Sequence, residues 1–371
     1  MRVVLTGGGT GGHVYPALAI AGGIMHRHPD SEILYIGASH GFESDIVPKA
    51  GYSFFPIPVK GLERKISLRN ILAAWQAGKS YALARAKIAE FKPHVVVGTG
   101  GYVCGPVVLA AVHLGIPTLI HEQNALPGLT NRLLSRYVTK TALAFMDAYK
   151  YFPSRARVIL TGLPVRAEIL RADRREARER LGLGDLFTVI SFGGSQGART
   201  LNNAFLEVLP LLAPDVRFHF FHATGPAGYR DFLAGLENRG FNSQKNGRVV
   251  VASYFYNIPE LLAAADLVVC RAGASTLAEV TVLGLPSILI PYPFATGNHQ
   301  EYNARALADR GAALLIRDSE VTGRKIAALI KGLEGDRARL ESMRTASKQL
   351  GKRRALENLL DAVDSIASCD R

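Results

Sequence analysis

Short apolar runs alternate along the chain with glycine-rich loops and with longer stretches of helical periodicity. The first run, Val3–Leu5, leads into the glycine cluster GGGTGGH at residues 7–13, and a helical pattern extends from Val14 to about His28. The next apolar run, EILYI at residues 32–36, completes a strand–helix–strand unit. Because such units place their strands parallel and side by side, the pattern predicts an α/β fold at the start of the chain.

The rest of the first half continues this alternation, with strands expected at residues 52–57, 94–97, 118–120 and 158–160. The second of these strands runs into another glycine loop, which consists of Gly98, Thr99, Gly100, Gly101 and Tyr102. The third ends in the polar run His121-Glu122-Gln123-Asn124. Open α/β sheets bind ligands at the carboxyl ends of their strands. We therefore favour a ligand site at this polar run over the alternative, a buried structural network.

After residue 166 the same pattern starts again. Prolines and a shift in composition mark a linker around residues 150–166, and a strand at 188–191 then leads into the loop GGSQGA at 193–198. Two glycine loops about 185 residues apart, each after the first strand of its own α/β run, indicate two similar domains. We predict an N-terminal domain over residues 1–160, a C-terminal domain over 161–350, and a terminal helix in 351–371 that packs back toward the N-terminal domain.

The second half contains one further patch with candidate chemistry. Strands are expected at residues 217–221, 248–251, 267–270 and 287–291, and three helices from about 321, 336 and 354 close the chain. Between them, Thr276 and Glu279 have the spacing of a capping box, which by itself predicts an ordinary helix start. The same helix start could face a diphosphate, with Glu279 accepting hydrogen bonds from ribose hydroxyls.

Composition narrows the function classes. The 371 residues, 48% hydrophobic and 20% charged, suffice for two domains with their own cores. The net charge is +13, and residues 1–165 hold 17 of the 44 basic but only 8 of the 31 acidic residues, so we expect the first half to meet an anionic partner. Three distant cysteines, Cys104, Cys270 and Cys369, argue against a disulfide framework or a metal cluster and fit small buried side chains in a reducing cytosol.

Two membrane questions arise from the sequence. The uncharged stretch Val95–Ile120 carries too many glycines and prolines for a spanning helix, and no secretory signal is visible at the start, so we expect a cytoplasmic protein. Residues 60–92 hold eight basic and two acidic residues among apolar ones. Such a segment suits an anionic membrane surface, and equally an amphipathic helix packed on the sheet. The candidate membrane residues are Ile71, Leu72, Trp75 and Lys79.

The first glycine loop is ambiguous when taken alone. Gly7, Gly9 and Gly12 match the dinucleotide fingerprint as well as a phosphate-binding loop. A nicotinamide cofactor would need an acidic residue at the end of the second strand, where the chain reads Ile36-Gly37-Ala38-Ser39. The missing acid argues against NAD and in favour of another phosphate-containing ligand.

Seven blocks occur in one order between residues 7 and about 304: GGGTGGH, GTGGYVCGP, HEQNALPGLTN, GLPVR, GGSQGA, CRAGASTLAE and HQEYNA. Together they resemble the signature blocks of the MurG family, the bacterial glycosyltransferases that add N-acetylglucosamine to the lipid-linked muramyl-pentapeptide precursor of peptidoglycan. The resemblance implies a GT-B architecture, with two facing Rossmann-like domains and the active site in the cleft between them. It also implies UDP-N-acetylglucosamine as the donor, undecaprenyl-pyrophosphate-linked lipid I as the acceptor, and lipid II as the product, formed with inversion at the sugar carbon.

The resemblance further implies a set of substrate contacts on this chain. They are Thr10, Gly11, Gly12, Asn124, Arg166, Ser195, Phe255, Ala274, Ser275, Thr276, Leu277, Ala278, Glu279 and Gln300, with residues 98–102 as an acceptor loop. Phe255 stands at a position where the family usually has a smaller aliphatic residue, next to Tyr254 and Tyr256, and His299 is an alternative to Gln300. The implied location is the cytoplasmic face of the bacterial inner membrane, as a peripheral protein, with other cell-wall and division proteins as possible partners.

The chemistry of an inverting transfer adds two expectations. No two aspartates lie two residues apart, so the chain lacks an Asp-x-Asp metal site, and backbone N–H groups, helix ends and Arg166 must meet the charge on the departing UDP. One base must also deprotonate the acceptor hydroxyl. His13 is the first candidate because an imidazole titrates near neutral pH, with shaping of the glycine loop as its alternative role, and Glu122 is the second candidate.

Three rival functions stay open at this point. A UDP-N-acetylglucosamine 2-epimerase or a diacylglycerol glycosyltransferase would share the fold. The sequence pI of about 9.7 also allows nucleic-acid binding, but no recognisable nucleic-acid module accompanies it. We therefore do not expect nucleic acid as a partner.

Overall fold

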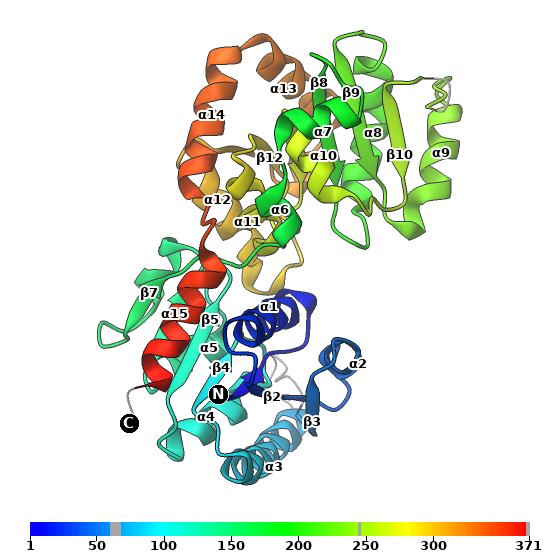
Figure 1. The fold of residues 1–371 in the computed structure, drawn as a ribbon. Coiled ribbons are helices and arrows are strands. Elements are labelled where there is room, and N and C mark those ends of the chain that lie inside the picture. The colour runs from blue at the N-terminus through cyan, green and yellow to red at the C-terminus, as the bar shows by residue number, and fades with distance from the viewer. Residues whose placement is uncertain (60–67, 244–245, 369–371) are drawn as a thin grey trace. The chain divides into compact units, whose positions relative to one another are not determined.

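The structure, a computed structural model, describes residues 1–59, 68–243 and 246–368, apart from the side chains of residues 68–74. The chain divides into two compact units, one formed by Met1–Pro164 with Arg354–Arg371 and the other by Val165–Arg353. Each unit contains its own parallel β-sheet with helices packed against it (Figure 1). The α/β class predicted from the alternating pattern is confirmed.

The first unit has a seven-stranded sheet in the order β3-β2-β1-β4-β5-β6-β7. Its strands are β1 (Arg2–Thr6), β2 (Glu32–Ala38), β3 (Ser53–Ile57), β4 (Val95–Gly98), β5 (Thr118–Glu122), β6 (Lys140–Leu143) and β7 (Val158–Leu160). Its helices are α1 (Gly11–Arg27), α2 (Glu43–Lys49), α3 (Leu68–Phe91), α4 (Cys104–His113), α5 (Leu129–Leu134) and α15 (Ala355–Ala367), with a 3₁₀ turn η1 at Met146–Tyr151.

The second unit has a six-stranded sheet in the order β10-β9-β8-β11-β12-β13. Its strands are β8 (Phe187–Phe192), β9 (Phe218–Ala223), β10 (Val249–Ala252), β11 (Leu267–Cys270), β12 (Ser287–Leu289) and β13 (Ala313–Leu315). Its helices are α6 (Ala167–Arg171), α7 (Arg174–Arg180), α8 (Arg199–Leu212), α9 (Tyr229–Glu237), α10 (Ile258–Ala264), α11 (Ala274–Leu283), α12 (His299–Ala308), α13 (Gly323–Gly335) and α14 (Arg337–Leu350), with 3₁₀ turns η2 (Pro226–Gly228), η3 (Thr296–Asn298) and η4 (Asp318–Glu320).

The apolar runs of the sequence are strands that are buried on both faces. In β1, Val3 and Leu5 pack toward α1 and α15, while Val4 packs on the opposite face with residues of α3 and α4. Helices on both faces exclude water from the whole strand, so continuous rather than alternating hydrophobicity is needed. The terminal helix α15 lies beside α1 at the end of the chain (Figure 1).

Both sheets reverse their strand order at a corresponding place. In the first sheet β1 lies between β2 and β4, and in the second β8 lies between β9 and β11. Parallel α/β sheets bind ligands beyond the carboxyl ends of the strands at such a switch point. The loops that follow β1, β4, β8 and β11 are therefore the places to look for a site in each unit.

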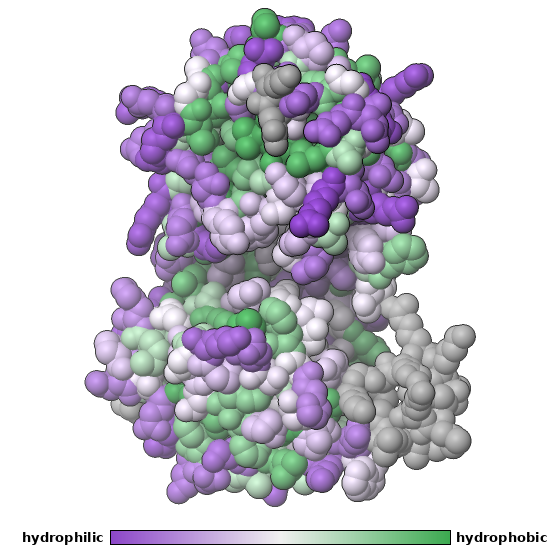
Figure 2. Space-filling model, turned by 90° about the vertical axis from the view of Figure 1, so that its right-hand side faces the viewer, coloured by the Kyte–Doolittle hydropathy of each residue, from purple (hydrophilic) through white to green (hydrophobic). Residues whose placement is uncertain are grey.

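Two further features are the distribution of apolar residues on the surface and the burial of the cysteines. Figure 2 shows apolar (green) residues scattered among polar (purple) ones over one face of the molecule. Within the described residues, no helix is both long and apolar enough to cross a bilayer. Cys104 and Cys270 are fully buried, as predicted, and burial raises the pKa of each thiol to about 12. Cys369 lies outside the described residues.

Candidate functional site

The two glycine loops of the first unit are in contact. The N–H of Gly8 donates to the carbonyl of Gly100 at 3.2 Å. A Cβ on Gly101, whose φ is +84°, would overlap the carbonyl oxygen of Gly8, so only glycine allows this approach. The loops after β1 and β4 thus form one continuous backbone surface at the switch point of the first sheet.

A buried carboxylate that sequence reasoning missed lies behind the first loop. Glu43 is fully buried, and its two carboxylate oxygens accept hydrogen bonds from the N–H groups of Gly9 and Ala38, each at 3.0 Å. A Cβ on Gly8 or Gly41 would overlap this carboxylate. An internal anion therefore already occupies part of the loop that the sequence assigned to phosphate. The sequence signal for it is Glu43 close to Gly37 and Gly41, since glycines leave room for a neighbouring side chain.

The helix start after the first loop has no side-chain cap. Helix α1 begins at Gly11, inside the glycine cluster and three residues earlier than expected. Its N-cap Thr10 makes no capping hydrogen bond, and its first turn contains no acidic residue. Backbone N–H groups at such an end can meet a polar ligand. The candidates Thr10, Gly11 and Gly12 lie at this helix start.

His13 lies in the first turn of α1, half-buried between the two glycine loops. Its Nδ1 lies 3.0 Å from the carbonyl oxygen of Thr99 and 3.1 Å from Oε1 of Gln123. The hydroxyl of Thr99 donates to the carbonyl of His13 at 2.7 Å, which fixes the backbone as well. Among the described residues, Nε2 of His13 has no hydrogen-bond partner.

The polar run at the end of β5 is largely a buried hydrogen-bond network, the alternative to a ligand site that the sequence also allowed. His121, Glu122 and Gln123 are 0%, 2% and 2% exposed. The carboxylate of Glu122 accepts from the N–H groups of Asn124 (2.9 Å) and Gly128 (3.1 Å) and from the side chain of Asn131 (2.9 Å). The second base candidate therefore holds the turn after β5, and Asn124 is half-exposed beside it.

The corresponding loop of the second unit borders an open pocket. This pocket, of about 540 Å³, brings the glycine loop after β8 together with the loop after β11 and the start of α12. It is lined by Gly193, Gln196, Gly197, Ala198, Arg199, Thr200, Arg271, Tyr292, Pro293, Phe294, Gln300 and Asp318. Ser195 lies exposed at the tip of the same loop. Of the predicted donor contacts, Gln300 lines this pocket, and its Oε1 accepts from the N–H of Tyr292 at 2.9 Å.

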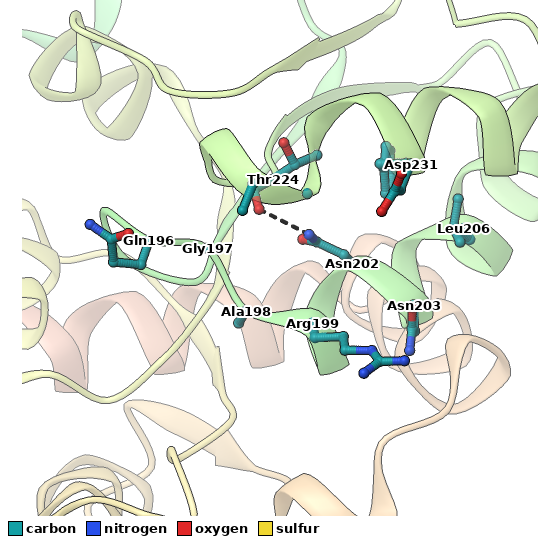
Figure 3. A pocket seen from close by; sticks show the side chains of 12 residues that line it. Gln196, Gly197, Ala198, Arg199, Asn202, Asn203, Leu206, Thr224 and Asp231 are labelled. Carbon is teal, nitrogen blue, oxygen red and sulfur yellow. Dashed lines mark hydrogen bonds between the residues drawn. The ribbon is translucent and has the colours of Figure 1, made fainter.

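Arg199 and Arg271 are two cations that the candidate residues did not include. Arg199 is exposed at the start of α8. Arg271 is buried, forms an ion pair with Asp318, and lies over the ring of Tyr292 at 5.6 Å. Arg199 also lines a second pocket of about 490 Å³ on the other side of the loop, where Asn202 donates to the carbonyl of Thr224 at 2.9 Å (Figure 3). An arginine directly after a glycine loop is a signal that the sequence did contain.

The capping box predicted at Thr276 and Glu279 is wrong. Helix α11 begins at Ala274 with Gly273 as its N-cap, and no side chain caps it. Glu279 instead bonds Arg166 through both carboxylate oxygens, at 2.8 and 2.9 Å. This bidentate pair raises the pKa of Arg166, so its positive charge is secure. The start of α11 is left as a helix N-terminus with open N–H groups beside an ion pair.

The uracil candidate Phe255 and the membrane candidates of α3 are not among the residues that line the pocket beside the second glycine loop. Phe255 is 8% exposed and packs edge-on against Phe221, whereas Tyr256 is 91% exposed. Trp75 is 64% exposed with Lys79 over its ring, and the side chains of Ile71 and Leu72 lie outside the described residues. Among the residues that the structure describes, no three or more His, Cys, Asp and Glu side chains are grouped as metal ligands would be.

An exposed apolar and basic surface occurs on α5 and η1 of the first unit. We call it the α5–η1 surface: Leu129, Arg132, Leu133, Arg136, Tyr151, Phe152 and Pro153 line a hollow there of about 280 Å³. Leu129 is 67% and Leu133 50% exposed. Arg132 and Lys150 both lie over the ring of Tyr151. The composition does not indicate this surface, because its residues come from two separate stretches of the sequence.

Comparison with known proteins covers both units. Residues 3–143 match the model of the glycosyltransferase family 28 N-terminal domain, and residues 188–359 match that of its C-terminal domain. The UDP-N-acetylglucosamine–N-acetylmuramyl-(pentapeptide) pyrophosphoryl-undecaprenol N-acetylglucosamine transferase of Desulforudis audaxviator is 57% identical, over 99% of both chains. That of Desulforamulus reducens is 52% identical, again over 99% of both chains. The crystal structure of MurG from Acinetobacter baumannii is similar with a TM-score of 0.81 and 30% identity, covering 98% of this chain and 99% of that one.

Proposed function

The chain belongs to glycosyltransferase family 28, and from this we propose that it transfers N-acetylglucosamine from UDP-N-acetylglucosamine to the 4-hydroxyl of the muramoyl sugar of lipid I, giving lipid II. The observation that carries the proposal is the 57% identity, over 99% of both chains, to a transferase of this activity. The two Rossmann-like units are those of a GT-B enzyme. The epimerase and diacylglycerol transferase alternatives have no comparable support.

In the proposed reaction the second unit binds the donor. The pocket beside residues 193–200 offers a glycine loop, the cations Arg199 and Arg271, and Gln300. The open start of α11 adds further positive potential on the same unit, and Arg166, paired with Glu279, lies beside it. When the bond between the sugar carbon and the UDP oxygen breaks, these groups stabilise the charge that develops on the diphosphate. UDP-N-acetylglucosamine is a substrate, and no tightly bound cofactor is part of the proposal.

The first unit supplies the base and meets the acceptor. Nε2 of His13 takes the proton of the acceptor hydroxyl while its oxygen attacks the sugar carbon from the face opposite UDP, which inverts that centre. Support comes from the position of His13 between the two glycine loops, at the uncapped start of α1. Glu122 is the weaker candidate because four hydrogen bonds already occupy its carboxylate.

One assay tests this function. Purified protein with radiolabelled donor is given lipid I, buffer alone or diacylglycerol, and the products are separated. We expect label in lipid II and release of UDP only with lipid I. N-acetylmannosamine formed from the donor alone would identify an epimerase, and labelled diacylglycerol would identify the other transferase.

We also propose that the protein binds peripherally to the cytoplasmic face of the inner membrane, where its lipid-linked acceptor lies. The support is the α5–η1 surface together with exposed Trp75 and Lys79 of α3, since both α3 and α5 pack against α4. Exposed apolar side chains next to arginine and lysine combine burial with attraction to anionic lipid. Association with other cell-wall and division proteins stays a prediction.

Flotation with liposomes tests the membrane proposal. We expect the protein to float with anionic vesicles at low salt and to be released at high salt. The double variant Arg132→Gln, Arg136→Gln should float less, whereas Arg175→Gln, which changes an exposed arginine of the second unit, should not. Equal flotation of both variants would remove the α5–η1 surface from the proposal.

A further inference from the structure

The side-chain amide of Gln123 has only one orientation that satisfies its surroundings. Its Nε2 lies 2.8 Å from the carbonyl oxygen of Thr99 and 3.1 Å from that of His121. Backbone carbonyls only accept hydrogen bonds, so the NH₂ group must face them. A flipped amide would place its oxygen against two other oxygens in a site that is 2% exposed. The atom that faces Nδ1 of His13 is therefore the amide oxygen.

The neighbouring His121 closes the network on the other side. Its Nε2 lies 2.9 Å from the carbonyl oxygen of Gly162 and must donate to it, so Nδ1 is free to accept from Gln123 at 3.2 Å. Full burial lowers the pKa of His121 to about 4, so the ring is neutral at neutral pH. No other placement of the protons on His121 and Gln123 would satisfy these contacts with the amide of Gln123 flipped.

These contacts determine where His13 carries its proton. Both groups that face Nδ1, the carbonyl of Thr99 and Oε1 of Gln123, are acceptors. We propose that Gln123 is a positioning residue that fixes His13 in the tautomer protonated at Nδ1 and leaves the Nε2 lone pair for the acceptor hydroxyl. The proposal deepens the function given above and rests on it for the role of Nε2. Catalytic histidines commonly have a hydrogen-bond partner at one ring nitrogen, and this partner fixes the tautomer and leaves the other nitrogen to act as the base.

The tautomer can be read directly from the full-length protein without turnover. In ¹⁵N-histidine NMR spectra at a pH where His13 is neutral, we expect the proton on Nδ1. Gln123→Leu removes one of the two acceptors, and the share of the tautomer protonated at Nε2 should rise by about fivefold, the equivalent of one hydrogen bond.

Asn131→Leu is the matched control. Asn131 is an equally buried amide that bonds the carbonyl of His121 and the carboxylate of Glu122 but not His13, so its loss should leave the tautomer of His13 unchanged. In the transfer assay, Gln123→Leu should lower kcat by up to about twofold with the donor KM unchanged, because much of His13 stays in the competent tautomer. A wild-type proton on Nε2, or the same tautomer shift in Asn131→Leu, would overturn the proposal. A failed transfer assay would overturn the function and leave the tautomer measurement standing.

Discussion

The two units use the same device, a glycine loop between a strand and a helix, in opposite ways. In the first unit the loop after β1 is filled from within, because the carboxylate of Glu43 bonds the N–H of Gly9 and takes the space beside Gly8. In the second unit the loop after β8 is closely packed at Gly193 and Gly197 but open at its tip, where a Cβ on Gly194 would meet no atom within 4 Å. The loop of the first unit borders His13, whereas the loop of the second unit borders a pocket that Arg199 and Arg271 line.

This difference shows what a glycine motif can and cannot specify. Glycines make room for something close to the backbone, but the sequence does not say whether that is a ligand or another side chain. The side chain of Glu43 already uses an amide of the first loop that a ligand would need, whereas the exposed Arg199 beside the second loop favours an anion. This contrast supports the proposal that the second unit binds the diphosphate of the donor and the first unit carries the base.

The largest expected effect is on stability, and it separates the two loops. Gly8→Ala should destabilise the protein by about 3 kcal/mol, because the added methyl displaces a buried carboxylate from its two N–H donors. Gly194→Ala should cost only about 1 kcal/mol, the strain of a φ of +92°, since its Cβ meets open space. Urea unfolding of both variants measures the difference. Equal losses would mean that the first loop is not packed around Glu43.

The next effect concerns catalysis in the first unit. His13→Ala should lower kcat by about 10²-fold or more and leave the donor KM nearly unchanged, because it removes the base but not the donor pocket. His26→Ala, an exposed histidine on the same helix, serves as the control and should keep wild-type kinetics. Unchanged turnover in His13→Ala would remove it from the base role and bring Glu122 forward.

Much of the fold could be predicted because strands buried on both faces leave a plain apolar signal, as Val3–Leu5 does. The strand Lys140–Leu143 is not predicted, because it begins with a lysine and a threonine and offers only Ala142 and Leu143 as an apolar run. The place of His13 beside the first glycine loop could be predicted because loop and helix start are adjacent in the sequence. Its partners Thr99 and Gln123 could not, since they come from elsewhere in the chain. Glu279 was assigned to a local cap, yet Arg166, 113 residues earlier, holds it.

A smaller effect is expected at the donor side of the second unit. Arg166→Ala should raise the donor KM by about tenfold, since it removes a charge-assisted contact and leaves Glu279 unpaired near a diphosphate. The value of kcat should change less than in His13→Ala. Arg175→Ala, an exposed arginine nearby in the chain, is the control. A KM that stays at the wild-type value would mean that the ion pair serves only to hold α6 against α11.

The last expected effect is a difference in acid sensitivity between the units. Burial lowers the pKa of His121 in the first unit to about 4, and in the second unit those of His219 to about 4 and His222 to about 3. These histidines are neutral when folded, while the unfolded chain takes up protons below its ordinary pKa of about 6.5. Stability is therefore lost as the pH falls from about 6.5 toward 4, by roughly 1.4 kcal/mol per pH unit for each fully buried ring.

Because the second unit has two such rings and the first has one, the second should open earlier on acidification. Pulse proteolysis of the full chain in urea, with the fragments mapped by mass spectrometry at pH 7 and pH 5, should show the first cleavages moving into residues 165–353. His222→Leu places an apolar side chain that cannot take up a proton between Phe205 and Phe232. This variant should therefore be less sensitive to acid. Cleavage that begins in the first unit at pH 5 would show that the buried histidines do not set the order in which the units unfold.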